Sequence, residues 1–280
     1  MKKIKWLLVV LFLTLIVVTW VIWSNIALEI TKIKIEDINM PYTLDGFKIV
    51  QISDLHNYEY GKNNEKLIEN VKKEKPNIIA ITGDFIDYQG QKKDVALYVA
   101  QKCVEIAPTF YITGNHESGI YNYDDFMNKL RDVGVEILDN RLIEFPYNNT
   151  YINVVGILDP SDGFYGYDYG EITFNRLEKA MEGKKDYYTI LLTHRPEYYE
   201  VYKQFPINLV LSGHTHGGQF RLPFVGGVLG HNKVLFPKYD AGLFIENGVY
   251  MMISRGLGSS FRVPIRINNR PELVVIELIQ

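Results

Sequence analysis

Five short runs of β-forming apolar residues along this chain each end in residues that can bind a metal ion. The runs cover 47–52, 77–82, 109–113, 187–193 and 207–211, and their length and composition predict buried strands. Helical spacing between or after them occurs at 63–75, 94–106, 123–133, 174–181 and 197–204. This repeated order predicts an α/β fold, in which helices cover a sheet and the site lies at the carboxyl ends of the strands. Further strands are expected at 28–37, 135–145, 151–157, 249–254 and 273–279.

The candidate metal ligands at these strand ends are a mixture of carboxylates, imidazoles and one amide. They are Asp54, His56, Asp84, Asn115, His194, His214 and His216. Such a set suits Zn, Mn or Fe better than Ca or Mg, which favour oxygen alone. It is too large for one tetrahedral ion but fits two ions that share a carboxylate. Paired ions clamp both the attacking and the leaving oxygen of an in-line displacement at phosphorus.

Simpler interpretations of single ligands stay open when each is taken alone. His214 and His216 lie among glycines in 212–219, where two solvent-facing turn histidines are the alternative. Asn115 follows a glycine, a position typical of a turn. Of the six histidines, only His231 lies away from the strand ends, and we expect it to be structural. The agreement among the strand ends favours a metal site over separate turns.

Taken together, these residues resemble the patterns of a known family. The patterns occur in the order Asp54-x-His56, Gly83-Asp84, Gly114-Asn115-His116-Glu117, His194 and Gly213-His214-x-His216. They are similar to the five motifs of the calcineurin-like metallophosphoesterases over about 48–278. The segments 217–223, 254–258 and 270–272 resemble a bacterial, often membrane-associated branch with UDP-2,3-diacylglucosamine hydrolase-like and phosphodiesterase-like enzymes. The resemblance implies a four-layer αββα sandwich.

The same resemblance implies roles for the site residues. One divalent ion would be held by Asp54, His56, Asp84 and His216, and the other by Asp84, Asn115, His194 and His214. A hydroxide bridging the ions would attack phosphorus, while His116 would contact the phosphate and protonate the leaving oxygen. Protein serine/threonine phosphatases of this superfamily carry Asp-Arg-Gly where this chain has Asp87-Tyr88-Gln89, which argues against a protein phosphatase.

Other polar and apolar residues near these patterns have weaker interpretations. Arg195 and Arg255 are candidates for binding an anionic substrate, with a surface role as the alternative. Asp87 either orients a ligand histidine or belongs to a turn. The apolar run at 220–225 fits either the core or a lip for acyl chains.

The N-terminal segment predicts a membrane anchor. Residues 6–23 carry no charge and follow Lys2, Lys3 and Lys5, and as a helix they span roughly 27 Å, close to a bilayer core. We therefore expect a basic cytoplasmic end at 1–5, an anchor at 6–23, a linker with an edge strand at 24–46, and a catalytic domain at 47–280 outside the membrane. Export after signal-peptide cleavage is the alternative, although 24–27 is a poor cleavage site.

Composition narrows the function further. A net charge of −3 without a basic stripe does not indicate nucleic-acid binding, and nothing suggests an obligate protein partner. The single cysteine, Cys103, excludes an intrachain disulfide and is expected in the core. We predict a membrane-anchored, dinuclear metal-dependent phosphohydrolase for a phosphodiester, phosphomonoester or lipid-linked pyrophosphate. A catalytically silent metal-binding receptor or scaffold is the alternative.

Overall fold

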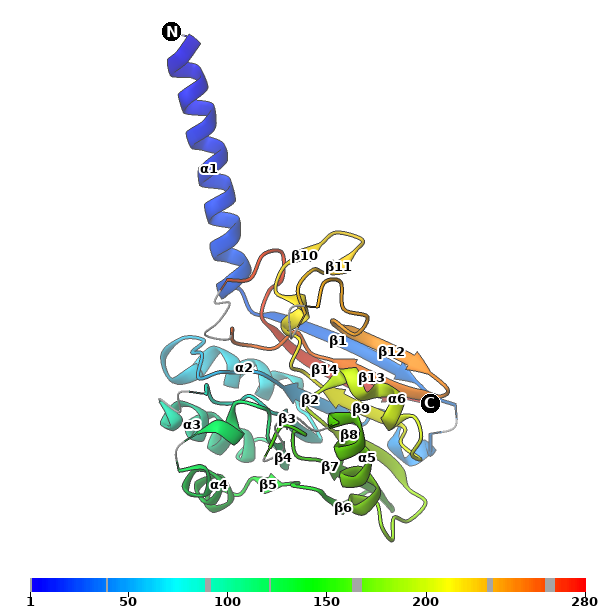
Figure 1. Ribbon diagram of the computed structural model, residues 1–280. Helices are drawn as coiled ribbons and strands as arrows, with labels where there is room; N and C mark the ends of the chain where they lie inside the picture. The colour runs from blue at the N-terminus through cyan, green and yellow to red at the C-terminus, as the bar shows by residue number, and fades with distance from the viewer. Residues whose placement is uncertain are drawn as a thin grey trace.

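The computed structural model describes residues 2–38, 40–88, 92–120, 122–162, 168–230, 234–259 and 265–280. Two six-stranded sheets pack face to face, and helices cover the outer face of each, which confirms the expected αββα sandwich. A long N-terminal helix projects from one end of this sandwich (Figure 1). His231, whose structural role was expected, lies outside the described residues.

The first sheet has the strand order β1-β14-β2-β3-β4-β5. Its strands β2, β3, β4 and β5 run parallel, while β14 is antiparallel to β2 and parallel to β1. The bounds are β1 Glu29–Glu36, β2 Lys48–Ile52, β3 Ile78–Thr82, β4 Thr109–Ile112, β5 Glu136–Ile137 and β14 Glu272–Ile279. The edge position expected for 28–37 is confirmed by β1.

The second sheet has the strand order β12-β13-β9-β8-β7-β6. Its four inner strands are parallel and both edges are antiparallel. The bounds are β6 Arg141–Tyr147, β7 Thr150–Gly156, β8 Tyr188–Leu192, β9 Leu209–Ser212, β12 Gly242–Glu246 and β13 Val249–Ile253. The strands β10 Arg221–Leu222 and β11 Gly226–Gly227 pair with each other in a separate two-stranded hairpin.

Strands of the first sheet bury apolar side chains on both faces because alternate residues point in opposite directions. In β3, Ile78 and Ala80 pack between the sheets, whereas Ile79 and Ile81 pack under the helices. Helices α2 Glu65–Glu74, α3 Lys93–Val104 and α4 Tyr123–Asp132 cover this sheet, while α5 Tyr169–Ala180 and α6 Tyr199–Tyr202 cover the other. The parallel strands therefore bring their carboxyl ends to a common edge.

The N-terminal helix α1 runs from Lys2 to Ile26 and is exposed along almost its whole length. Among the described residues it is the one helix long and apolar enough to cross a membrane. Its last turn contacts the domain: the side chain of Asn25 donates to the carbonyl of Arg266 at 2.8 Å, and the guanidinium of Arg270 lies over the Trp23 ring at 4.6 Å. The helix is thus held at its base.

One sequence expectation about the strands was wrong. The run 135–145 was expected to be one strand, but β5 pairs with β4 in the first sheet and β6 pairs with β7 in the second. Asn140 adopts a left-handed conformation with φ 53° between them, and its Oδ1 accepts a hydrogen bond from the Leu158 N–H at 3.0 Å. This turn carries the chain from one sheet to the other. Strand β12 was missed because its exposed edge position leaves little alternation.

Candidate metal centre

The candidate ligands lie on loops that follow five parallel strands at the common edge. The loops after β2, β3 and β4 belong to the first sheet, and those after β8 and β9 belong to the second. The two sheets are joined beside the site, since the Gln51 side-chain amide donates both to Thr82 Oγ1 at 3.0 Å and to the Ser212 carbonyl at 2.9 Å. Six of the seven candidate ligands are buried, and Asn115 is half-buried.

The first ligand group consists of Asp54, His56 and His216, whose ligand atoms lie within 4.8 Å of one another. The Nε2 atoms of His56 and His216 face each other at 3.2 Å, and His216 Nε2 lies 3.7 Å from Asp54 Oδ1. Two ring nitrogens facing each other beside a carboxylate are an arrangement that can hold a cation.

The second ligand group consists of Asp84, His194 and His214, again within 4.8 Å. His194 Nε2 lies 3.1 Å from His214 Nδ1 and 3.3 Å from Asp84 Oδ2. The same Asp84 Oδ2 is 3.7 Å from His56 Nε2 in the first group. Asp84 therefore faces both groups, as expected of a carboxylate that bridges two ions.

Two further observations test whether these residues fit a metal. The Asn115 Oδ1 atom is buried and has no hydrogen-bond partner among the described residues. Buried polar atoms normally have a partner, and a bound cation would provide one here. His194 Nδ1 lies 2.9 Å from the Thr82 carbonyl, so it donates its proton there and directs Nε2 toward the ligand group. Ligand histidines are commonly oriented by such a hydrogen bond. The donor set fits two divalent ions.

Burial sets the protonation of most ligands in the metal-free site. Burial lowers the pKa of His56 to about 3 and that of His216 well below its usual range, so both imidazoles are neutral. Burial also raises the pKa of Asp54 to about 6. For His194, burial is the largest effect and lowers the pKa, but the carboxylates of Asp84, Asp54 and Asp159 together outweigh it and raise the pKa to about 10. His194 and Asp84 therefore form a buried ion pair that a cation would replace.

These values predict that metal affinity rises with pH. Between about pH 6 and 10, the ion bound through His194 must displace the proton of that histidine, so the logarithm of its affinity should rise by about one per pH unit. The other ion, bound through Asp54, must displace the proton of Asp54 below about pH 6, so its affinity should rise with pH in that lower range. Titration calorimetry with Mn²⁺ in buffers of different ionisation enthalpy measures the protons released. An affinity that stays constant from pH 5 to 9 contradicts this assignment.

The backbone at the ligands is strained. Asp54, His56, Asp84, His214 and His216 all have positive φ angles, between 46° and 69°. Left-handed conformations at non-glycine residues cost roughly 1–2 kcal/mol each and concentrate at functional sites. Glycines make room for them: a Cβ on Gly114 would lie 2.2 Å from Asp84 Oδ1. A sequence pattern does not show this conformation, and we did not anticipate it.

His116, the candidate general acid, lies next to the shared carboxylate. Its Nε2 is 3.7 Å from Asp84 Oδ2, and its Nδ1 accepts from the Tyr88 N–H at 3.0 Å. Asp87 Oδ1 lies 3.1 Å from the same Nδ1. Asp87 thus contacts a histidine, but this histidine is the candidate acid and not a metal ligand. This arrangement leaves a proton on Nε2, where a leaving oxygen would need it.

Glu117 received no role from the sequence, although it is the last residue of the motif 114–117 that follows β4. Its buried carboxylate accepts hydrogen bonds from the N–H groups of Asp84, Phe85 and Gly114 at 3.0, 2.6 and 2.8 Å. Burial raises its pKa to about 7, and the Asp84 carboxylate adds to this shift. Glu117 therefore ties the loops after β3 and β4 together beneath the ligands.

The two arginines proposed to bind substrate are already engaged. Arg195 pairs with Asp159 through Nε at 2.7 Å and Nη2 at 3.1 Å, while its Nη1 lies 3.3 Å from His214 Nε2 at the site. Arg255 Nη2 contacts Glu272 at 2.8 Å and Glu29 at 3.0 Å. These contacts favour a structural role for Arg255. Substrate binding by Arg195 stays a prediction, and it would involve Nη1, which also lies 3.3 Å from Glu197 Oε1.

Sequence reasoning missed two residues behind His216. The fully buried Arg266 places Nη2 3.3 Å from His216 Nδ1. Asn269 donates to the His216 carbonyl at 2.7 Å. Neither residue follows a strand or belongs to a local pattern, so only the folded chain shows that they support a ligand.

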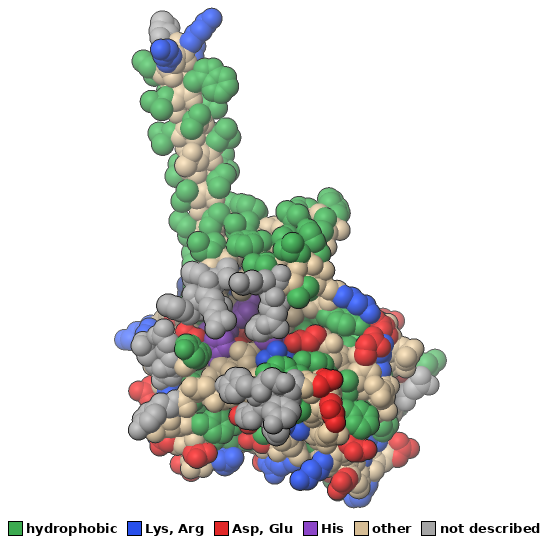
Figure 2. Space-filling view, viewed as in Figure 1, with side chains coloured by type: hydrophobic (Ala, Val, Ile, Leu, Met, Phe, Trp, Pro, Cys, Tyr) green, Lys and Arg blue, Asp and Glu red, His purple; other side chains and the backbone are tan. Residues whose placement is uncertain are grey.

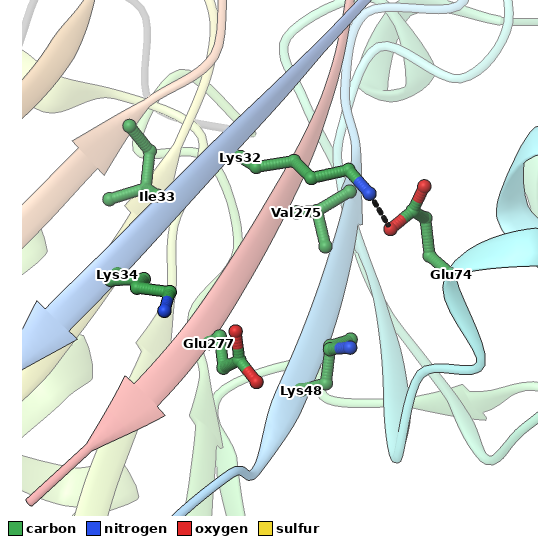
Figure 3. Close-up of a pocket in the computed structure, with 7 residues that line it drawn as sticks. All are labelled: Lys32, Ile33, Lys34, Lys48, Glu74, Val275 and Glu277. Carbon is green, nitrogen blue, oxygen red and sulfur yellow. Dashed lines mark ion pairs between the residues drawn. The ribbon is translucent and has the colours of Figure 1, made fainter.

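A pocket of about 260 Å³ on the outer side of the first sheet is separate from this centre (Figure 3). It is lined by side chains of β1, β14, β2 and the end of α2, and a Lys32–Glu74 ion pair of 2.6 Å closes one side of it. None of the candidate ligands lines this pocket.

Known proteins resemble this chain in sequence and in fold. The model of the calcineurin-like phosphoesterase family matches residues 47–218. The metallophosphoesterase YkuE of Bacillus subtilis is 30% identical over 90% of this chain and 85% of its own length. Phosphodiesterase YaeI of Escherichia coli is 27% identical over 83% and 82%. The crystal structure of TT1561 of Thermus thermophilus shares the fold with a TM-score of 0.53 and 15% identity, over 76% of this chain and 92% of its own.

The family match covers more than half of the chain and includes all seven candidate ligands, from all five strand-end loops. The relatives extend the likeness to nearly the full length. This chain therefore belongs to the calcineurin-like phosphoesterases, a family of metal-dependent hydrolases of phosphoric esters.

Proposed function

We propose that this protein is a membrane-anchored phosphohydrolase that uses two divalent ions to hydrolyse a phosphodiester, a phosphomonoester or a lipid-linked pyrophosphate. The observation that carries the proposal is the shared Asp84 carboxylate, whose Oδ2 faces His56, His194 and His116 at 3.7, 3.3 and 3.7 Å. A ligand that serves two cation sites, with a proton donor beside it, suits in-line displacement at phosphorus.

The residues that would hold the ions fall into two sets that share Asp84. These are Asp54, His56, Asp84 and His216 for one ion, and Asp84, Asn115, His194 and His214 for the other. When bound, Mn, Fe or Zn ions would supply positive charge for the phosphate and lower the pKa of a water molecule. Neutral imidazoles at His56 and His216 are already in the state that metal binding requires.

The protein's own part in the reaction is to position groups and to move a proton. As an imidazolium, with the Asp87 carboxylate 3.1 Å from Nδ1, His116 would donate its Nε2 proton to the leaving oxygen and become neutral. Glu117 would keep the loops after β3 and β4 in place through its hydrogen bonds to their N–H groups. Because His116 is present and correctly placed, hydrolysis is favoured over a silent metal-binding scaffold.

We further propose that α1 is an uncleaved anchor, with the lysines at its start in the cytoplasm and the domain outside. Ser24 is buried against the domain, and Asn25 both donates to and accepts from the backbone of Arg266 at 2.8 Å. Removal of the segment at a signal-peptide site near residue 24 would destroy contacts that belong to the fold. This argues against export of a cleaved form.

Hydrolysis by the full chain tests the proposal. Protein in detergent should cleave bis(p-nitrophenyl) phosphate, p-nitrophenyl phosphate or a lipid pyrophosphate, lose this activity after chelation and regain it with Mn²⁺, Fe²⁺ or Zn²⁺. Elemental analysis of the same sample should find about two ions per chain. Metal-loaded protein that leaves all three classes of substrate intact would establish the scaffold instead.

A further inference from the structure

Exposed apolar side chains outside α1 concentrate in one place. Of the nine such Leu, Ile, Val and Phe residues described by the structure, six lie in the β10–β11 hairpin and the loop that follows it. We call this surface the apolar ledge, which consists of Leu222, Phe224, Val225, Val234, Leu235 and Phe236. The sequence left open whether the run at 220–225 is core or lip, and the exposure of three of its residues excludes the core.

The tip of the ledge is held in a conformation that displays an aromatic ring. Phe224 has a φ of 66° and is fully exposed, and the Val225 N–H donates to the Leu222 carbonyl at 3.2 Å to close the turn. A bulky residue with positive φ is costly. Full exposure of its ring adds the loss of hydrophobic burial. Such a combination is expected where the ring contacts something outside the chain.

The ledge lies beside α1 because both are attached to the same segment, 265–270. On one side of it, Asn25 at the end of α1 hydrogen-bonds the backbone of Arg266, and the Arg270 Nε–H donates to the Ala27 carbonyl at 3.0 Å. On the other side, the Arg221 N–H of β10 donates to the Ile267 carbonyl at 3.0 Å. The helix and the hairpin therefore keep a fixed relation to each other.

Figure 2 shows the result in space. A hydrophobic lobe, at the place where Figure 1 draws β10 and β11, rises beside the lower part of α1. Trp20 and Trp23, the tryptophans in the last two turns of α1, are 40% and 47% exposed. Tryptophans at the end of an apolar helix mark the membrane–water interface. The ledge thus continues the apolar surface of the helix at the depth of that interface.

We propose that the apolar ledge inserts into the same bilayer leaflet that α1 enters, as a second membrane contact of the domain. The occupant of the ledge is lipid, because the ledge adjoins the apolar helix and carries few charges. Within 220–236 the sequence has two charged residues, Lys233 and Arg221, and Arg221 pairs with Asp240 at 2.9 Å. This inference rests on the anchoring role proposed for α1.

Insertion of the apolar ledge into the bilayer would determine how substrate reaches the metal centre. Figure 2 shows histidine side chains in a hollow directly below the base of α1 and the hydrophobic lobe. With the ledge in the leaflet, this hollow is held at the level of the lipid head groups. A phosphoester that remains in the membrane by its acyl or polyprenyl chains can then reach the centre, which narrows the proposed substrate to lipid-borne phosphates.

A fluorescent label at the tip tests the docking without any need for turnover. Phe224→Cys in the full chain is labelled with an environment-sensitive dye and reconstituted in phospholipid vesicles. Burial raises the pKa of Cys103 to about 12, so this native thiol should not react. The matched control is Ile245→Cys on β12, also exposed. We expect a blue shift at 224 and stronger quenching by shallow than by deep lipid nitroxides, because interfacial groups lie roughly 5–10 Å into the boundary.

The label at 245 should respond only to aqueous iodide. If iodide quenches the label at 224 as strongly as the label at 245, the ledge does not insert into the bilayer. If the same protein still hydrolyses soluble phosphoesters, the proposed phosphohydrolase function is unaffected by this result. Protection from iodide without any effect of lipid nitroxides also overturns the insertion of the ledge, since a second protein copy would then cover the surface. If lipid nitroxides quench the label at 224 but the protein hydrolyses no phosphoester, the membrane contact of the ledge is supported and the proposed function is refuted.

Activity gives an independent test. The double variant Phe224→Ser, Leu235→Ser should lose rate on a vesicle-borne phosphoester while its rate on bis(p-nitrophenyl) phosphate is unchanged. Ile245→Ser should preserve both rates. Equal rates of the double variant and the control on vesicle-borne substrate would contradict the role of the ledge in substrate access.

Discussion

Asp84→Ala should bind neither ion tightly and should lose phosphoesterase activity by at least ~10³-fold, since the ions supply several kcal/mol of transition-state stabilisation. The reason is the position of Asp84 Oδ2, which faces a histidine of each ligand group at 3.7 and 3.3 Å. Loss of this one carboxylate removes a ligand from both sites. Metal content by elemental analysis and turnover of bis(p-nitrophenyl) phosphate are the measurements.

The matched control is Asp125→Ala, which removes an exposed carboxylate of α4 that pairs with Lys129 at 2.8 Å. An exposed ion pair of this kind contributes at most about 1 kcal/mol, so the control should keep its metal and activity. Circular dichroism should show that both variants are folded. If Asp84→Ala retains two ions and its full rate, the dinuclear centre described above is wrong.

His116→Ala should lose about 10²–10⁴-fold in kcat, the usual range for general acid–base catalysis, while metal content stays unchanged. The imidazole contacts Asp87 and the Tyr88 N–H, and it belongs to neither of the two predicted ligand sets. The defect should depend on the leaving group. It should be small for p-nitrophenyl esters, whose leaving oxygen needs little protonation, and large for alkyl esters, whose leaving oxygen is strongly basic.

Asp87→Asn is a milder change that tests the same proton transfer by His116. It keeps the shape beside His116 Nδ1 but removes the carboxylate 3.1 Å away that stabilises the imidazolium. We expect a smaller loss of rate with the same dependence on leaving group. A uniform loss across leaving groups in both variants, or loss of metal from His116→Ala, would assign His116 to metal binding instead of proton transfer.

The location of the centre could be predicted from the sequence because it depends on strand order alone. Parallel strands end at one edge of a sheet, so a ligand after each of β2, β3 and β4 must lie near the others. That the loops after β8 and β9 meet them follows from the packing of two sheets, which the family resemblance implied. No periodicity in the chain shows how the two sheets face each other.

What could not be predicted depends on contacts between distant parts of the chain or on backbone conformation. Arg266 supports His216 although the two are 50 residues apart, and no local pattern marks it. The run at 135–145 was predicted as one strand, but the chain passes from the first sheet to the second within it. The turn depends on the left-handed conformation of Asn140, which amino-acid composition does not reveal. The exposure of Phe224 likewise follows from the hairpin and not from its neighbours in sequence.

The two ligand groups each combine residues from both sheets: Asp54 and His56 with His216, and Asp84 with His194 and His214. A cation in either group is therefore a cross-link between the halves of the sandwich, comparable to a disulfide that forms and breaks with metal supply. An ion that binds the folded chain and not the unfolded one would add to the stability of the domain, against the cost of the strained backbone at five ligands. Metal starvation would consequently loosen the whole domain and expose it to proteases, in addition to stopping its chemistry.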